Sequence, residues 1–306
     1  MNTLKKLFLF GILSLFISPF FYSCGSNENE SDAEGTDSTS TDSSQVKDKK
    51  AQNIFYAIPS PIELSLLIQR AGATYNKDLL NPIDNKDKYS TNISRSLNLG
   101  IYGADLSYTS VFDNNTQESI LYLGCTRKLA ESIGVGSAFD EKTINRIEAN
   151  TGKKDSLLTI ISDSYMNTDE LLKENRRESA SALVISGGFI EGLYLGTQLI
   201  KSSKNNADII IRIAEQKGTL ENVIALLTQY RSDAGITEVL TNMKSLKEIF
   251  DLVIVSNESS LSVKTNPTTK VINIGGKKKY SITPDVLEKL TVKIAEIRNK
   301  IINGQI

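Results

Sequence analysis

The stretch Ile185-Ser186-Gly187-Gly188-Phe189-Ile190-Glu191-Gly192-Leu193-Tyr194 carries small or apolar side chains at nearly every position. A helix without a polar face is buried at the centre of a helical protein, because a surface helix keeps one side polar. Glycine inside a helix costs about 1 kcal/mol relative to alanine, so these glycines need a packing or functional reason. Gly188, Gly192 and Gly196 recur every four residues and form a ridge that a neighbouring backbone can approach. The pattern predicts the central helix of a bundle.

A second stretch has the same character: Leu99-Gly100-Ile101-Tyr102-Gly103-Ala104-Asp105-Leu106-Ser107-Tyr108. Each stretch holds one carboxylate, followed three residues later by a tyrosine: Asp105 with Tyr108, and Glu191 with Tyr194. An Asn-Asn pair and a further helical pattern follow in both cases. We therefore expect two central helices. Either a helical hairpin has been duplicated about a pseudo-twofold axis, or the similarity arose by chance.

Amphipathic patterns and capping residues predict helices through most of the remaining chain. Residues 270–282 alternate in polarity around Gly275-Gly276, which is typical of a small β-hairpin turning on that pair. The predicted fold class is all-α, a multi-helix bundle with one small β-hairpin. The helices are expected at about residues 60–72, 91–112, 115–134, 140–151, 154–166, 169–201, 207–217, 219–231, 237–255 and from 283 onward.

The two carboxylates are the candidate ligand or cation site, with three tyrosines as further members. If Asp105 and Glu191 face each other in the core, they could bind a ligand or cation or act as an acid/base pair, because burial raises the pKa of an unpaired carboxyl group. The favoured alternative is structural: each carboxylate pairs with a core basic residue or tyrosine, since buried charges are commonly paired. The tyrosines of the candidate site are Tyr102, Tyr108 and Tyr194, and the arginines nearest in sequence are Arg95, Arg176 and Arg177.

Missing residue types exclude several kinds of chemistry. The chain contains no histidine, which rules out Ser-His-Asp and Cys-His catalysis and histidine-ligated metal or haem sites. It also has no phosphate-binding or dinucleotide-binding glycine motif, so no cofactor is expected. The net charge of −1 and the lack of a long basic run argue against a nucleic-acid partner. Cys125 lies four residues from both Leu121 and Leu129, and we interpret it as a core residue.

The amino terminus has the pattern of an export signal. Lys5 and Lys6 precede the apolar residues 7–17, a run too short to be a permanent membrane span. The run is followed by Phe21-Tyr22-Ser23-Cys24-Gly25, which resembles the lipobox of bacterial lipoproteins. That resemblance implies that Cys24 is acylated, for example with palmitate, and becomes the first residue of the mature chain. The alternative is an ordinary signal peptide, in which Cys24 is incidental.

This interpretation divides the chain into three segments. Residues 1–23 are the expected lipoprotein signal peptide, and residues 24–50 combine the lipidated cysteine with a disordered, acidic, Ser/Thr-rich tether. Residues 51–306 form the helical domain, in which 261–306 could pack as an appendage. The acylated Cys24 would attach the protein to a lipid bilayer, most simply the bacterial outer membrane. Whether it faces the periplasm or the cell surface stays open.

Three segments of the chain resemble a family of uncharacterised Bacteroidota lipoproteins. They are Phe55-Tyr56-Ala57-Ile58-Pro59-Ser60-Pro61-Ile62-Glu63, the segment from Tyr102 to Tyr108, and the segment from Gly187 to Tyr194. The resemblance implies an envelope location and no particular activity. We expect a non-enzymatic helical module that binds an envelope protein partner or a small ligand. The alternative is a carboxylate-based enzyme or cation-binding protein that uses Asp105 and Glu191.

Overall fold

The computed structural model describes residues 61–112, 116–150, 152–233, 235–257, 262–265, 272–275 and 278–306. By its internal contacts the chain divides into Met1–Thr41 and Asp42–Ile306, and every described residue belongs to the second unit. The expected signal peptide, Cys24 and the tether therefore lie outside the described residues.

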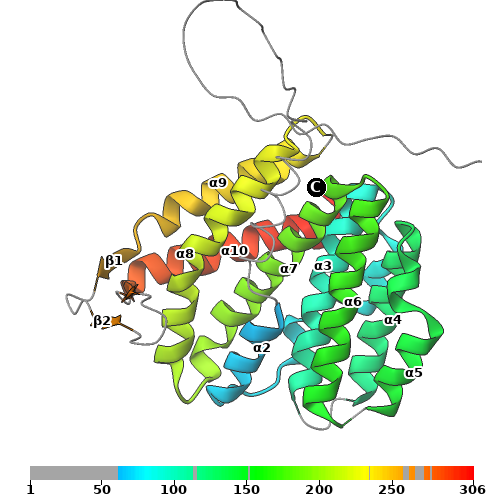
Figure 1. The fold of residues 1–306 in the computed structure, drawn as a ribbon, viewed down its shortest axis with the longest axis horizontal. Helices are drawn as coiled ribbons and strands as arrows, with labels where there is room; N and C mark the ends of the chain where they lie inside the picture. The colour runs from blue at the N-terminus through cyan, green and yellow to red at the C-terminus, as the bar shows by residue number, and fades with distance from the viewer. Residues whose placement is uncertain are drawn as a thin grey trace, which may run out of the picture. The chain divides into compact units, whose positions relative to one another are not determined.

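The described part is a multi-helix bundle, which confirms the all-α fold class (Figure 1). Its long helices alternate with short 3-10 turns, labelled η. In chain order the elements before the strands are α2 (Pro61–Arg70), η1 (Lys77–Leu79), η2 (Ile83–Asp87), α3 (Asn92–Val111), α4 (Thr116–Ser132), η3 (Gly136–Phe139), α5 (Glu141–Ala149), α6 (Lys154–Glu174), α7 (Glu178–Leu199), η4 (Ile200–Ser202), α8 (Asn206–Gln229) and α9 (Ile236–Phe250). The final helix, α10, spans Pro284–Ile302.

The two glycine-rich stretches form α3 and α7, which pack against each other at the centre of the bundle. A Cβ atom on Gly100 would lie 2.0 Å from the carbonyl oxygen of Val184. A Cβ atom on Gly187 would lie 1.9 Å from the carbonyl oxygen of Leu97. Both distances are far below van der Waals contact, so the glycines are required for the two backbones to meet. This contact explains the glycines at 100 and 187, but the expected ridge of Gly188, Gly192 and Gly196 does not make it: Gly192 and Gly196 face the side chain of Leu64 and not a neighbouring backbone.

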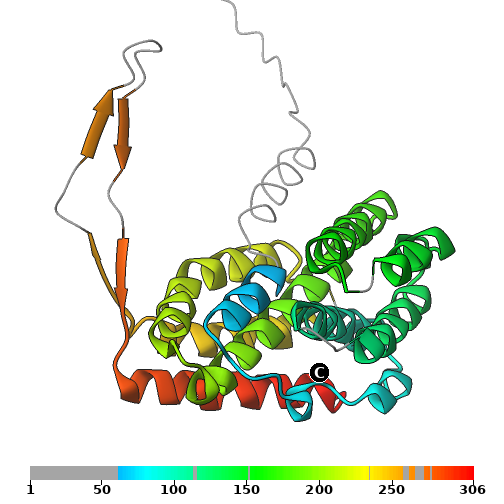
Figure 2. The ribbon, with the colours of Figure 1, turned by 90° about the horizontal axis from the view of Figure 1, so that it is seen from below.

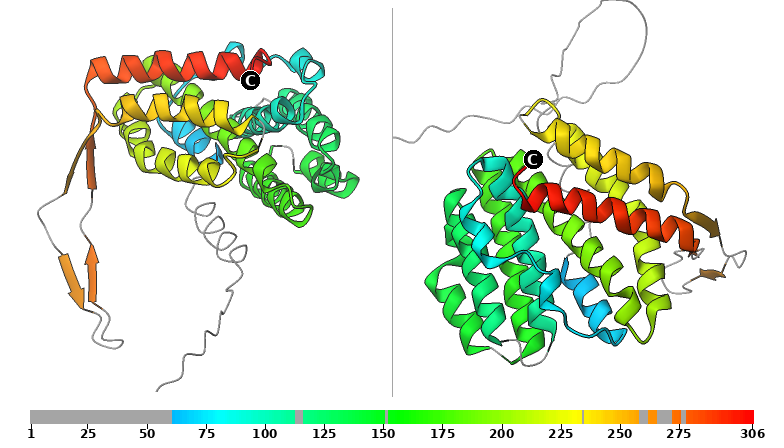
Figure 3. Two further views of the ribbon diagram at one scale, coloured as in Figure 1. Left: turned by 90° about the horizontal axis from the view of Figure 1, so that it is seen from above. Right: turned by 180° about the vertical axis from the view of Figure 1, so that it is seen from behind.

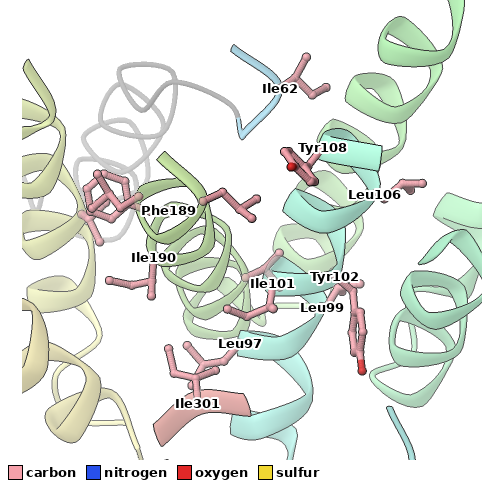
Figure 4. Close-up of a cluster of buried hydrophobic side chains, with 14 of the residues drawn as sticks. Ile62, Leu97, Leu99, Ile101, Tyr102, Leu106, Tyr108, Phe189, Ile190 and Ile301 are labelled. Atoms are coloured by element: carbon pink, nitrogen blue, oxygen red, sulfur yellow. The ribbon is translucent and has the colours of Figure 1, made fainter. Parts of the chain in front are cut away.

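The other helices surround this pair. The α4 helix packs on α3, α8 packs on α7, and α10 crosses both α7 and α9 (Figures 1 and 3). Figure 4 shows Leu97 of α3 beside Ile301 of α10, within the same apolar core as Ile190 of α7. The segment Glu178–Ser202 is long and apolar enough to cross a membrane, but 83% of its apolar window is buried inside the bundle. Among the described residues it is the one such helix, and its burial is that of a core helix.

Three predicted helix boundaries are wrong. The helix expected at about 237–255 ends at Phe250, and Ile254–Asn257 form the strand β1 instead. The sequence predicts a break at Thr168, between helices at about 154–166 and 169–201, but α6 continues through it to Glu174, and the chain turns at Arg176, whose φ is 55°. The Thr168 side chain is buried and donates to the carbonyl oxygen of Ser164 at 2.8 Å, so it does not cap a helix. Likewise, α8 runs unbroken through Gly218, because buried apolar residues on both sides of this glycine outweigh its cost of about 1 kcal/mol.

β structure is present near residues 270–282, as expected, but the pairing differs from the prediction. β3 (Ile272–Gly275) pairs antiparallel with β2 (Ser262–Thr265), and β4 (Lys278–Ser281) pairs antiparallel with β1 (Ile254–Asn257). β3 and β4, which lie before and after Gly275-Gly276, therefore do not pair with each other, so this glycine pair does not close the predicted hairpin. Figure 2 follows β1 as it leaves α9 and β4 as it leads into α10.

Candidate functional site

Asp105 and Glu191 lie together in the core, both fully buried. Asp105 belongs to α3 and Glu191 to α7, and the glycine contact between these helices brings the two carboxyl groups within hydrogen-bonding reach. Oδ2 of Asp105 accepts a hydrogen bond from the backbone N–H of Asn81 at 3.1 Å. Its other oxygen, Oδ1, is buried and meets no donor among the described residues.

Glu191 is held by an arginine from the last helix. Arg298 of α10 donates to both carboxylate oxygens of Glu191, with Nε–Oε2 and Nη2–Oε1 distances of 2.9 and 3.0 Å. Nη2 of Arg298 also donates to the carbonyl oxygen of Leu79 at 2.8 Å. The guanidinium carbon lies 4.3 Å from the centre of the Tyr194 ring, a cation–π contact. Glu191 and Arg298 therefore form a buried bidentate ion pair.

Burial and the neighbouring Glu191 and Arg298 determine the protonation of Asp105. Burial raises its pKa well above the usual value of 3.8, and the neighbouring Glu191 carboxylate raises it further. Arg298 and the Asn81 N–H favour the ionised form but do not restore the usual pKa. Two carboxylates cannot hydrogen-bond to each other, whereas a protonated Asp105 can donate to Glu191. We therefore interpret the cluster as neutral Asp105, anionic Glu191 and cationic Arg298, with no net charge.

Asn81 connects this cluster to the surrounding elements. It lies between η1 and η2, is fully buried and uses all its hydrogen-bonding groups. Its backbone N–H serves Asp105, and its carbonyl oxygen accepts from the Tyr122 hydroxyl of α4 at 3.0 Å. Its side-chain amide donates to Tyr89 and Asn98 and accepts from Asn85. The segment that carries Asn81 is thereby fixed to the bundle by polar contacts.

The three tyrosines of the predicted site have different partners. Tyr194 lies against Arg298, so it belongs to the cluster. Tyr102 points away from α7 (Figure 4) and donates to the carbonyl oxygen of Pro82 at 2.8 Å. Tyr108 accepts from the backbone N–H of Asn76 at 3.0 Å and stacks on Tyr75. Burial raises the pKa of Tyr108 to about 12. The structure thus brings Asp105, Glu191 and Tyr194 together and gives the other two tyrosines structural hydrogen bonds.

The arginine that pairs with Glu191 was not among those suggested by sequence proximity. Nε of Arg95 donates to the Tyr89 carbonyl oxygen, Arg177 donates to the Ile133 carbonyl oxygen, and Arg176 occupies the turn after α6. Arg298 could have been found from a different signal. It lies one turn after Ile294, on the apolar face of α10, where a charged side chain requires a buried partner.

Cys125 is a core residue, as expected. It is buried and unpaired, and its Sγ lies 3.8 Å from the carbonyl oxygen of Ile83. Burial raises the pKa of the thiol to about 11, so the reactive thiolate is scarce at neutral pH.

The geometry supports a structural role for the carboxyl pair better than a catalytic one. Both side chains are fully buried, and Glu191 has its two oxygens occupied by Arg298. Among the described residues no group of three or more carboxylate or cysteine side chains could hold a metal ion. A general acid must reach a substrate, and Asp105 instead has its contacts within the protein.

Comparison with known proteins adds no further assignment. No protein-family model, curated protein or solved structure matches this chain.

Proposed function

We propose that this chain is a lipid-anchored lipoprotein of the bacterial outer membrane, and that its helical domain is a non-enzymatic module binding a partner protein. The Cys24 lipobox supports the anchor. The absence of histidine and the ion pair of Arg298 with both oxygens of Glu191 support a role without catalysis. The partner would belong to the same envelope compartment, on whichever face of the membrane the domain lies.

The observation that carries the binding proposal is a run of exposed apolar residues, close together in the sequence, where α9 leads into β1. Leu252, Ile254 and Val255 are 54%, 59% and 40% exposed, and we call them the α9–β1 corner. Adjacent exposed apolar side chains are unfavourable in water and commonly mark a surface that a partner covers. The corner is firmly held, because Nζ of Lys217 donates to the carbonyl oxygens of Asp251 and Val253 at 3.3 and 3.2 Å. Its apolar side chains are therefore presented on a fixed backbone.

Co-purification from native membranes tests this proposal. A tagged wild-type chain should recover a stoichiometric partner, and Ile254→Asp should reduce that recovery about tenfold or more, since buried charge at an apolar interface costs at least 1.4 kcal/mol. Met166→Asp is the matched control, because Met166 is similarly exposed, at 51%, but lies on α6. Equal recovery for Ile254→Asp and wild type would remove the α9–β1 corner from the proposal.

A further inference from the structure

A surface groove runs between α2, α7 and α8 and has a volume of about 370 Å³. Its floor is apolar because Gly188 and Gly192 contribute no side chain, while Phe189 and Leu193 supply carbon surface. A Cβ atom on Gly192 would lie 3.4 Å from Cδ2 of Leu64, an ordinary van der Waals contact, so it would fit there but would fill part of the groove. The rim is charged, with Glu63 and Arg70 on α2 and Arg212 on α8.

The α2 helix faces the groove with apolar side chains that the described residues do not fully cover. Leu64, Leu66 and Leu67 all line the groove and are only partly buried. Ile62 and Ile68 of the same helix, in contrast, are buried in the core. A ten-residue helix with apolar residues on both of these sides is typical of an element packed between two apolar surfaces. The bundle supplies one of them.

The chain itself contains an apolar segment that could supply the second apolar surface against α2. The described residues begin at Pro61, the first residue of α2, and the residues immediately before it read Ile54-Phe55-Tyr56-Ala57-Ile58-Pro59-Ser60. Four of the five residues at 54–58 are large and apolar, whereas residues 25–45 contain none. A chain spans up to about 3.5 Å per residue, so this segment reaches roughly 20 Å from the start of α2. Glu63 and Leu64, in the first turns of α2, already line the groove.

We propose that residues 54–58 occupy this groove, so that Phe55, Tyr56 and Ile58 cover the leucines of α2 and the glycine floor of α7. The occupant is a segment of the same chain, held next to the groove by two residues, which makes its effective concentration very high. The free tether then ends at about residue 53, and the force of any anchor acts on the groove face of the bundle. This inference does not depend on lipidation of Cys24 or on the α9–β1 corner.

Disulfide trapping in the full-length chain tests the proposal directly. Cys24→Ala and Cys125→Ala remove the native thiols, so the outcome is independent of acylation. Phe55→Cys is then combined either with Arg212→Cys on the groove rim or with Lys142→Cys on α5, a matched exposed position. The proposal predicts a mild-oxidation disulfide for the Arg212→Cys pair and little or none for the Lys142→Cys pair. Equal yields for the two pairs, or no disulfide with Arg212→Cys, would overturn it.

Limited proteolysis gives a second readout without engineered cysteines. Chymotrypsin should cut after Phe55 and Tyr56 about tenfold or more slowly in the wild type than in Ile58→Asp, because docking must open before cleavage. Trypsin cleavage after Lys47, Lys49 and Lys50 is the internal control and should be the same in both proteins. Identical chymotrypsin rates for the wild type and Ile58→Asp would contradict the proposal and leave the groove open to a partner protein.

Discussion

The protonation of the Asp105 carboxyl group depends strongly on its surroundings. Its pKa is raised first by burial and then by the charge of Glu191, so it remains a neutral acid where an exposed aspartate is ionised. As a neutral acid it can donate to Glu191, which Arg298 already holds from the other side. The cluster then avoids the repulsion of two adjacent carboxylates. Its stability is consequently linked to pH.

Asp105→Asn should remove this pH dependence while preserving the contacts. Asparagine can accept from the Asn81 N–H and donate to Glu191, as the protonated acid does. The folded-state pKa of Asp105 is raised, so its contribution to stability is complete below the unfolded pKa near 3.8 and is lost as pH rises. Relative to Asp105→Asn, the wild type should lose about 1.4 kcal/mol per pH unit above that value, until the folded pKa is reached.

Urea unfolding across a pH series measures this difference. Asp163→Asn, an exposed substitution on α6, is the control and should leave the wild-type pH profile unchanged. A uniform loss of stability in Asp105→Asn, with the pH dependence intact, would show that Asp105 is ionised in the folded protein.

The ion pair of Glu191 and Arg298 should be strongly coupled. Glu191→Gln leaves a buried guanidinium without its counter-charge, and Arg298→Gln leaves a buried carboxylate, so each should cost about 3–5 kcal/mol. The double variant should cost less than the sum of the two, because neither charge is then stranded. A double-mutant cycle by urea unfolding checks this, and strict additivity would mean that the pair is not formed.

At the scale of elements, the contact between α3 and α7 positions the whole centre. It depends on Gly100 and Gly187, each of which faces a backbone carbonyl that no Cβ atom could approach. The glycine-rich pattern predicted the burial of both helices and a close backbone contact, but it placed that contact on the ridge of Gly188, Gly192 and Gly196, of which Gly192 and Gly196 face side chains. The pattern could not show that α3 and α7 pack against each other, since the two helices are far apart in the chain.

Gly187→Ala should be strongly destabilising despite the better helix propensity of alanine. The added methyl group would force α3 and α7 apart, and overpacking of this kind costs about 3 kcal/mol. Gly124→Ala on α4 is the matched control, because its added Cβ atom meets nothing within 4 Å. There alanine should stabilise the helix by up to about 1 kcal/mol. Thermal unfolding of both variants gives the comparison, and a neutral Gly187→Ala would contradict the described packing.

Local patterns predicted elements better than they predicted boundaries and long-range pairs. Gly218 indicated a break that α8 does not have, because tertiary packing outweighs one glycine. Gly275-Gly276 indicated a tight turn, whereas β3 and β4 pair with β2 and β1, whose register no local signal specifies. Arg298 was missed for a similar reason: it is 107 residues from Glu191, and only its place on an apolar face points to a buried partner.

At the scale of the molecule, the polar centre unites distant parts of the chain. Asn98 donates to the carbonyl oxygen of Ile301 at 3.1 Å, and Tyr89 donates to that of Ile302 at 3.1 Å. With Arg298, these contacts fix the end of α10 to α3 and to the segment between α2 and α3. Such a network stabilises one arrangement of the bundle.

The proposed anchoring through Cys24 has its own prediction. Wild-type protein should incorporate labelled palmitate and enter the detergent phase, because two or three buried acyl chains give nearly permanent membrane attachment. Cys24→Ala should do neither, and Cys125→Ala, which removes a buried thiol, should behave as wild type. Palmitate labelling of Cys24→Ala at the wild-type level would refute the lipobox interpretation.

We propose that this domain acts through its surface and that its buried carboxyl pair has a structural role. The decisive measurement is partner recovery from native membranes, compared between Asp105→Asn and Ile254→Asp. Both proteins are first shown to be folded by their unfolding transitions. We expect wild-type recovery for Asp105→Asn and a loss of about tenfold or more for Ile254→Asp. Loss of the partner in folded Asp105→Asn, with full recovery in Ile254→Asp, would contradict it.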